Sequence, residues 1–465
     1  MSKTSRRDFI IKTGAGAAAG LLVSTRQVAA NQYVMEVAQD AAKVSPNDKI
    51  RFATIGMGIQ GSSDTRSAMS TGLGEIVAVA DIYDGRRERS QEVWGKQVFT
   101  TRDYREVLAR NDVDAVIIAT PDHWHAQICV DAMKAGKHVY CEKPMVQKLP
   151  DGHKVIKAEK ETGKVFQVGS QRVSSIIYAK AKELLASGAI GELNLVDIWL
   201  NRRTANGAWQ YSIPPDAIPE RIDWDRFLGN TPKVPFEPIK LFRWRNYQAY
   251  GTGIGGDLFI HLFSGLHLMT GSNGPTRVVG AGGLRYWKDG RDVPDVLMGI
   301  CDYGKTANSS GFNVSLRVNF VDGSLDPNGG EDAGYRLVGN EGVISLSGRG
   351  VGLSRRKQPK EPGYNIDTFP KAIQDQFLKE YRAKYPPPEQ SMRQLSDEFY
   401  APPQGYSDSF DHFRNFFTAI RSGSKVVEDA TFGVRAAGPA LLTNQSFYEN
   451  RIMNWDPEAM KVTND

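Results

Sequence analysis

The first residues with a clear chemical use are three glycines spaced as G-x-G-x-x-G, at Gly56, Gly58 and Gly61. The first glycine permits a tight turn, the second lets the backbone approach a pyrophosphate, and the third lets a helix pack closely on a strand. A helix that begins at this point directs unpaired N–H groups and the positive end of its dipole at phosphates. The spacing predicts a dinucleotide-binding loop.

An acidic residue follows at the distance that such a loop requires. Asp81 lies 20 positions after Gly61, where a carboxylate would bind the ribose hydroxyls of the dinucleotide and repel a 2′-phosphate. Arg86 and Arg87 lie nearby and could accept a 2′-phosphate. The pattern therefore favours NAD and leaves NADP open.

Polar groups also follow later predicted strands, at Thr120–His125 and at Glu142–Pro144. Open α/β sheets bind their ligands at the carboxyl ends of the strands. Further along, Asp257 and His261 are four positions apart, so they would share one face of a helix. These groups are candidates for acid–base chemistry beside the dinucleotide.

The elements that would position these residues alternate between strands and helices from residue 48 onward. Apolar runs predict strands over residues 49–55, 75–82, 114–120, 138–142 and 165–169. Alternation with helices of 10–15 residues predicts a doubly wound parallel sheet, the Rossmann fold, over residues 48–170. Later runs at 312–320 and 335–346 alternate as strands do. We expect residues 171–465 to form an α+β domain with a large open, mostly antiparallel sheet.

The N-terminus is predicted to be a targeting signal. Arg6 and Arg7 precede a small and apolar run over residues 14–23, and Val28–Ala30 offers a peptidase site. Paired arginines before such a run are typical of twin-arginine export signals, and the run is shorter than the roughly 20 apolar residues of a membrane-spanning helix. We predict a signal peptide over residues 1–30, a linker over 31–47 and a periplasmic protein that is exported with its cofactor tightly bound.

Composition excludes several other classes of protein. The 465 residues are 40% hydrophobic and 24% charged, as expected of a soluble protein with two domains. Residues 1–30 hold four of the five net positive charges, so the remainder gives no reason to expect nucleic acid or membrane as a partner. Cys129, Cys141 and Cys301 are too few and too scattered for a disulfide framework.

From about residue 49 to its end the chain resembles the Gfo/Idh/MocA family of sugar and polyol dehydrogenases. The resemblance rests on Thr120-Pro121 with His125, and on Glu142-Lys143-Pro144, after the glycine motif. The stretches 224–229 and 411–416 resemble the exported branch of that family.

This resemblance implies roles for three residues. Lys143 would lie beside the nicotinamide and the reacting carbon, and Asp257 and His261 would lie at the substrate. We expect His261 to be the general base, since an ordinary histidine pKa of about 6.5 suits reversible proton transfer. Asp257 would bind a sugar hydroxyl or orient the imidazole. Many relatives have an aspartate three residues after that histidine, whereas this chain has Ser264.

The remaining predicted contacts divide between cofactor and substrate. Cofactor contacts are predicted for Gly56, Met57, Gly58, Ile59, Gln60, Gly61, Asp81, Arg86, Thr120, Pro121, His125, Glu142 and Lys143. Substrate contacts are predicted for Arg172, Trp209, Arg243 and Tyr247, three of them in a segment rich in aromatic residues and arginine. No metal is predicted, because no Cys or His cluster has zinc spacing and hydride transfer needs no metal.

The sequence therefore predicts an NAD-dependent oxidoreductase acting on a hydroxyl of a sugar or glycoside, for example at C3. One alternative is a redox-neutral NAD-dependent glycosidase, which oxidises its substrate transiently, eliminates, adds water and returns the hydride. The other is a non-catalytic sugar-binding protein. By resemblance, we expect a homo-oligomer formed through the C-terminal sheet.

Overall fold

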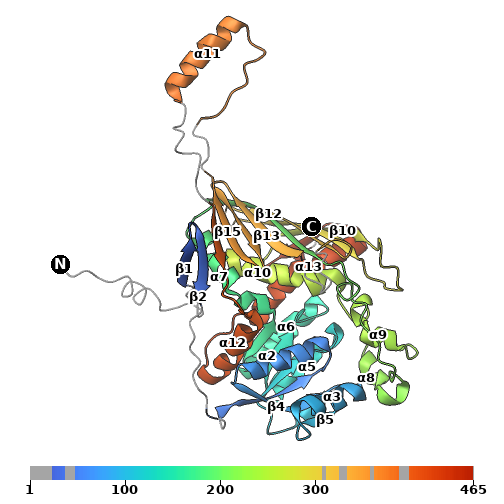
Figure 1. Cartoon of the computed structure of the whole chain (residues 1–465). Coiled ribbons are helices and arrows are strands. Elements are labelled where there is room, and N and C mark those ends of the chain that lie inside the picture. The colour runs from blue at the N-terminus through green and yellow to red at the C-terminus, as the bar shows by residue number, and fades with distance from the viewer. Residues whose placement is uncertain are drawn as a thin grey trace, which may run out of the picture.

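The computed structural model of this chain describes residues 24–36, 45, 48–305, 310–323, 332–356, 361–386 and 397–463. These residues form one sheet of six strands and one of twelve strands, with helices packed on both (Figure 1). The predicted fold class, a Rossmann sheet followed by a domain with a large and mostly antiparallel sheet, is confirmed.

The smaller sheet is parallel throughout and has the strand order β5-β4-β3-β6-β7-β8. Its strands are β3 (Ile50–Ile55), β4 (Gly74–Ala80), β5 (Phe99–Thr101), β6 (Ala115–Ile118), β7 (His138–Glu142) and β8 (Phe166–Gly169). This is the order of a dinucleotide-binding fold, in which the strand order reverses between β3 and β6 and a crevice opens at their carboxyl ends. Five of the strands were predicted, whereas the three-residue β5 was not.

Helices cover both faces of this sheet. They are α2 (Ile59–Ser70), α3 (Asp84–Trp94), α4 (Tyr104–Leu108), α5 (Asp122–Lys134) and α6 (Leu149–Thr162). The chain also returns from its C-terminal part, because α12 (Asp408–Ser422) packs on α2 and buries three phenylalanines against the sheet. The Rossmann core is thus completed by residues far outside 48–170.

The larger sheet has the order β1-β2-β16-β15-β14-β13-β9-β12-β11-β10-β17-β18. Its central strands are β9 (Leu193–Asn201), β10 (Arg277–Gly283), β11 (Val296–Tyr303), β12 (Phe312–Asn319), β13 (Asp332–Gly339), β14 (Gly342–Ser347) and β15 (Gly350–Arg355). The outer strands are β1 (Ser24–Ala29), β2 (Gln32–Glu36), β16 (Glu398–Ala401), β17 (Met453–Asp456) and β18 (Lys461–Thr463). Neighbouring strands are antiparallel except for the pairs β9–β12 and β2–β16.

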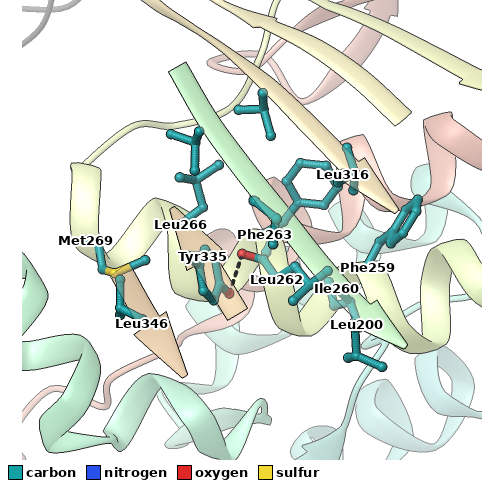
Figure 2. Packing of buried hydrophobic residues seen from close by; sticks show 14 of the residues in the cluster. Leu200, Phe259, Ile260, Leu262, Phe263, Leu266, Met269, Leu316, Tyr335 and Leu346 are labelled. Carbon is teal, nitrogen blue, oxygen red and sulfur yellow. Dashed lines mark hydrogen bonds between the residues drawn. The ribbon is translucent and has the colours of Figure 1, made fainter. Parts of the chain in front are cut away.

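One face of this sheet packs on α7 (Ile176–Ala186), α10 (Ile260–Thr270) and α13 (Ala430–Glu449). Figure 2 shows the core between α10 and the sheet, where Phe259 and Leu266 lie among strand residues such as Leu200, Leu316 and Leu346. The Tyr335 hydroxyl from β13 donates a hydrogen bond of 2.9 Å to the Leu262 carbonyl. The start of α10 is therefore fixed against the sheet. A further helix, α11 (Lys371–Lys384), lies between β15 and β16 in the chain.

The N-terminal predictions meet the structure only in part. Most of the predicted signal peptide, residues 1–23, lies outside the described residues, and its last residues form β1. Residues 32–36, which the sequence places in a linker, form β2 and pair with β1 and β16. Hydrogen bonding to two strands gives this short segment a defined place at the sheet edge.

Between β9 and α10 the chain leaves the large sheet and packs against the Rossmann domain. We call residues 202–251 the cover segment; it contains α8 (Trp224–Leu228) and α9 (Pro238–Phe242). Its apolar side chains form a core of their own with Tyr83 and Ile82 of the Rossmann domain. The Asp223 N–H also donates to the Ile82 carbonyl at 3.0 Å.

Candidate functional site

The glycine loop has the geometry that its spacing predicts. Gly56 ends β3 with φ of +90°, and a Cβ there would lie 2.7 Å from the Ala119 carbonyl oxygen. A Cβ on Gly61 would lie 2.0 Å from the Gly56 carbonyl oxygen. Neither position can hold a side chain without moving the backbone, so both glycines are needed for the close contact of β3, α2 and β6. These features fit a dinucleotide.

Asp81 is buried at the end of β4 and faces the same loop. Its carboxylate accepts hydrogen bonds from the Met57 N–H at 2.7 Å and the Tyr83 N–H at 2.9 Å. The Arg86 guanidinium lies 3.6 Å from the carboxylate and over the Phe242 ring. Asp81 therefore fixes the loop, and Arg86 lies above it.

A pocket runs from Asp81 and Arg86 to the ends of β3 and β6. Of the predicted cofactor contacts, eight line it: Gly56, Gly58, Ile59, Gln60, Asp81, Arg86, Thr120 and Pro121. The cover segment forms the opposite wall, to which it contributes Tyr211, Arg226, Phe227, Leu241, Phe242, Trp244 and Arg245. The crevice is thus enclosed by two distant parts of the chain.

Lys143 lies at the end of β7 and is buried. Its Nζ donates to the Asp257 carboxylate oxygen Oδ1 and to the Asp257 main-chain carbonyl, both at 2.9 Å. The Nε of Arg245 donates to the same Oδ1 at 3.0 Å. Burial raises the pKa of Asp257, but the charges of Lys143 and Arg245 outweigh it and hold that pKa well below its usual range. The structure thus brings together two of the three predicted catalytic residues.

Asp257 owes its position to the glycines that precede it. It lies in a single π-helical turn, Gly255–Phe259, that leads into α10. A Cβ on Gly255 would lie 2.4 Å from Asn444 Oδ1 of α13, and that oxygen accepts the Gly255 N–H at 3.2 Å. Glycine therefore allows this turn to approach α13 closely. Single π turns recur at functional sites because they shift the register of the helix.

The third predicted catalytic residue, His261, is the second residue of α10, four positions after Asp257. Its carbonyl accepts a hydrogen bond of 3.3 Å from the Tyr335 hydroxyl, so the sheet supports the backbone at this position. Its role as the general base remains a prediction.

The loop after β6 contains Thr120 and Pro121, and His125 lies in the first turn of the helix α5 that follows. The three residues differ in role. The His125 ring is buried and lies 2.8 Å from each of two carbonyl oxygens, those of Thr120 and Pro144. Burial lowers the pKa of His125, but Cys141 and Asp122, together with the Pro144 carbonyl, raise it to about 10. His125 therefore joins the two loops that carry Thr120 and Lys143, and it does not line the pocket.

Glu142 is also buried behind the pocket. Its Oε1 accepts hydrogen bonds from Gln171 at 2.5 Å and Gln60 at 3.4 Å, and Gln60 also donates to Asp64 at 2.9 Å. Burial and the neighbouring Glu142 charge raise the pKa of Asp64 well above its usual range. Glu142 thus links the glycine-loop helix to the strand that carries Lys143.

The predicted substrate residues do not form one group. Trp209 is fully buried and packs edge-to-face on Phe320 in the core of the large sheet, so its prediction as a sugar-stacking residue is wrong. Arg172 lines a separate cavity with Tyr178 and Tyr335. Arg243 and Tyr247 lie in the cover segment, and neither is among the described residues that line the dinucleotide pocket.

Arg245 and Trp244 are the clearest omissions from the predicted site. Arg245 contacts Asp257 directly, and its guanidinium lies 4.2 Å from the centre of the Trp244 ring. In the sequence, both residues lie in an irregular segment that is rich in aromatic residues and arginine. That composition does not indicate which of its arginines reaches the site.

Three further observations bear on cofactors and targeting. Among the described residues, no group of three or more His, Cys, Asp or Glu side chains is arranged to hold a metal ion. Cys129, Cys141 and Cys301 are buried and free, as predicted. No helix in the described ranges is long and apolar enough to cross a membrane.

The structure combines a Rossmann sheet and a large, mostly antiparallel sheet with a pocket at the glycine loop, and Arg245 connects the wall of that pocket to the buried Lys143–Asp257 pair. Residues 50–170 match the model of the oxidoreductase family with an NAD-binding Rossmann fold, GFO_IDH_MocA. This part of the chain is therefore similar to the NAD-binding Rossmann domain of that oxidoreductase family.

Curated relatives match over part of their length. Inositol 2-dehydrogenase of Salmonella typhimurium strain LT2 is 34% identical over 145 residues, which are 31% of this chain and 43% of that protein. A glycosyl hydrolase family 109 protein of Shewanella baltica strain OS155 is 30% identical over 213 residues, 42% of this chain and 45% of that protein. The chain thus spans about half the length, or somewhat less, of these relatives.

Solved structures extend the likeness in fold to most of the chain. Levoglucosan dehydrogenase in complex with NADH and levoglucosan has a TM-score of 0.62 at 18% identity, over 87% of this chain and 99% of that one. GenD2 from gentamicin A biosynthesis, in complex with NAD, has a TM-score of 0.61 at 17% identity over 88% and 97%. At this identity the likeness concerns the fold alone.

Proposed function

We propose that this protein is an NAD-dependent oxidoreductase that oxidises a hydroxyl group of a sugar or glycoside, for example at C3. The observation that carries the proposal is the buried Lys143–Asp257 pair, whose carboxylate binds Arg245 on the wall of the glycine-loop pocket. A binding module has no need to bury these charges, which argues against a protein that only binds sugar. The inositol and levoglucosan dehydrogenases named above agree with the substrate class.

Each residue has a task in such a reaction. Bound NAD would supply the hydride acceptor for the carbon that carries the hydroxyl. Lys143, paired with Asp257, would donate a hydrogen bond to the substrate oxygen and stabilise its negative charge as the proton leaves. His261, one helical turn along from Asp257, would accept that proton. Asp257 holds the lysine in place through the hydrogen bonds to its carboxylate and its main-chain carbonyl.

A redox-neutral glycosidase is the second candidate, and the glycosyl hydrolase family 109 relative favours it. This reaction uses the same hydride step, then eliminates the aglycone, adds water and returns the hydride. A cofactor enclosed by the cover segment suits a reaction that needs no external oxidant.

The two candidates are separated by one experiment. The purified protein is incubated with NAD and a panel of p-nitrophenyl glycosides, and NADH and nitrophenol are recorded together. Accumulation of NADH without nitrophenol is the result we expect of a dehydrogenase. Catalytic release of nitrophenol without net NADH would replace it with the glycosidase, and neither signal with any substrate would contradict both.

We further propose export to the periplasm by the twin-arginine route, with NAD already tightly bound. Arg6, Arg7 and the apolar run after them support the route. Cleavage after Ala30 would remove β1 and leave β2 paired with β16. The N-terminal sequence of the protein recovered from a periplasmic extract tests this, and an intact Met1 there would contradict it.

A further inference from the structure

Arg245 has donors that the protein itself does not use. Its Nε is bound to Asp257, and within the described part of the chain Nη1 and Nη2 make no hydrogen bond. The side chain is 20% exposed, and the residue lines the dinucleotide pocket near Thr120 and Pro121. The Trp244 ring holds the guanidinium plane in place. The free edge of a fixed guanidinium is a donor pair with parallel N–H groups.

Two cations share one carboxylate oxygen of Asp257. Lys143 and Arg245 both bind the single oxygen Oδ1, and Arg202 is close enough to lower the pKa of the same carboxyl. Asp122, the next carboxylate in reach of Arg245, is fully buried beneath the site, and burial raises its pKa to about 6. A bound anion beside Arg245 would further stabilise its largely buried charge.

The two oxygens of the Asp257 carboxylate differ in their contacts. The hydrogen bonds that Lys143 and Arg245 donate to the carboxylate both go to Oδ1. The site therefore offers an acceptor for a hydroxyl group and, beside it, a fork of two donors. A sugar with a carboxylate close to its hydroxyl groups matches both.

We propose that Arg245 binds a carboxylate of the substrate, so that the substrates are uronic acids or glycosiduronates. The proposal rests on the oxidoreductase function above and names its substrate class. A planar guanidinium binds a carboxylate through two parallel hydrogen bonds, which a neutral hydroxymethyl group cannot accept equally well. Arg245 is thus a specificity-determining residue.

The test uses the full chain loaded with NAD and matched pairs of substrates. Methyl glucoside is compared with methyl glucosiduronate, and methyl galactoside with methyl galactosiduronate, in both anomers. In whichever pair is oxidised, we expect kcat/KM to be at least about tenfold higher for the uronate than for the neutral glycoside. This ratio corresponds to about 1.4 kcal/mol of additional binding free energy. Binding to the NADH-loaded protein, followed by NADH fluorescence, should show the same preference.

Variants separate recognition from folding. Arg245→Gln should lower kcat/KM for both members of a pair, because Arg245 also binds Asp257, and should lower it about tenfold more for the uronate, whereas a structural defect alone would lower both equally. Arg245→Lys keeps the charge but loses the fork, and should keep part of the preference. Arg221→Gln, which alters a contact of the cover segment outside the pocket, is the matched control and should leave the preference unchanged.

The outcomes are distinct. Oxidation of neutral glycosides as fast as uronates, or a preference that survives Arg245→Gln, overturns the proposal and leaves the oxidoreductase function standing. Equal use of a 6-O-sulfated glucoside would show that charge alone is selected, which overturns the carboxylate assignment. Neither binding nor oxidation of any pair would contradict the proposed function as well.

Discussion

At the scale of single residues, we expect Asp81 to select which dinucleotide the loop accepts. Its carboxylate is close to the Met57 N–H and to Arg86, so a 2′-phosphate would meet negative charge at the point where the ribose must lie. Arg86 faces the pocket and could bind that phosphate once Asp81 is removed. The predicted preference for NAD thus depends on one side chain.

We predict that Asp81→Ser weakens NADH binding about tenfold and raises NADPH affinity, because the repulsion is lost while Arg86 remains. Fluorescence titration with both reduced dinucleotides measures the ratio. Arg87→Gln is the control, since Arg87 pairs with Asp84 and does not line the pocket. An unchanged NADH/NADPH ratio in Asp81→Ser would show that Asp81 does not select the cofactor.

Residue types alone predicted the glycine loop well and the substrate contacts poorly. Gly56 and Gly61 could be predicted because their role depends on local spacing and on the absence of a side chain. Trp209 and Arg245 lie in the same irregular segment, yet one is buried in the core and the other reaches Asp257. Tertiary packing decides which aromatic or arginine faces the pocket, and no periodicity in the segment encodes it.

At the scale of elements, the cover segment leads from the large sheet to the Rossmann sheet and forms one wall of the dinucleotide pocket. The Tyr83 hydroxyl hydrogen-bonds to the Asp216 carboxylate, and Arg221 pairs with Glu88 at 2.7 Å. None of these four residues lines the pocket. They therefore hold the wall of the pocket without touching what it contains.

We predict that Tyr83→Phe combined with Arg221→Gln increases the rate of NADH release about tenfold, because the cover segment then opens more often. Stopped-flow displacement of NADH measures the rate. Arg89→Gln removes an exposed ion pair on α3 that the cover segment does not contact, and it should leave the rate unchanged. An unaltered release rate in the double variant would mean that the cover segment does not retain the cofactor.

The parallel sheet was predictable at this scale because its longer strands are short, mostly apolar runs that alternate with helices. The contribution of α12 was not, because Phe413, Phe416 and Phe417 give only an amphipathic helix, and nothing local says which sheet that helix covers. The strand β2 was missed for a related reason. Three of its five residues pair with a strand more than 350 positions away, and a pairing over that distance leaves no pattern in the sequence nearby.

At the scale of the whole molecule, the large sheet has one face that the described helices do not cover. Along β11, Leu297 and Cys301 point into the core, whereas Met298 and Ile300 between them are 49% and 58% exposed. Val279 and Ala281 are the cross-strand partners of these two residues on β10. Adjacent apolar side chains on an open sheet are typical of a protein interface.

We predict that this face joins two copies of the chain, as the resemblance to the family led us to expect. Met298→Glu together with Ile300→Glu should turn the oligomer into monomers, because a two-fold axis would bring the like charges of both copies together. Sedimentation equilibrium measures the mass, and near-UV circular dichroism checks that the variant is folded. Val93→Glu, at a 43% exposed residue on α3, is the control and should keep the oligomer. A monomeric wild-type protein, or a double variant of unchanged mass, would show that the sheet face has another use.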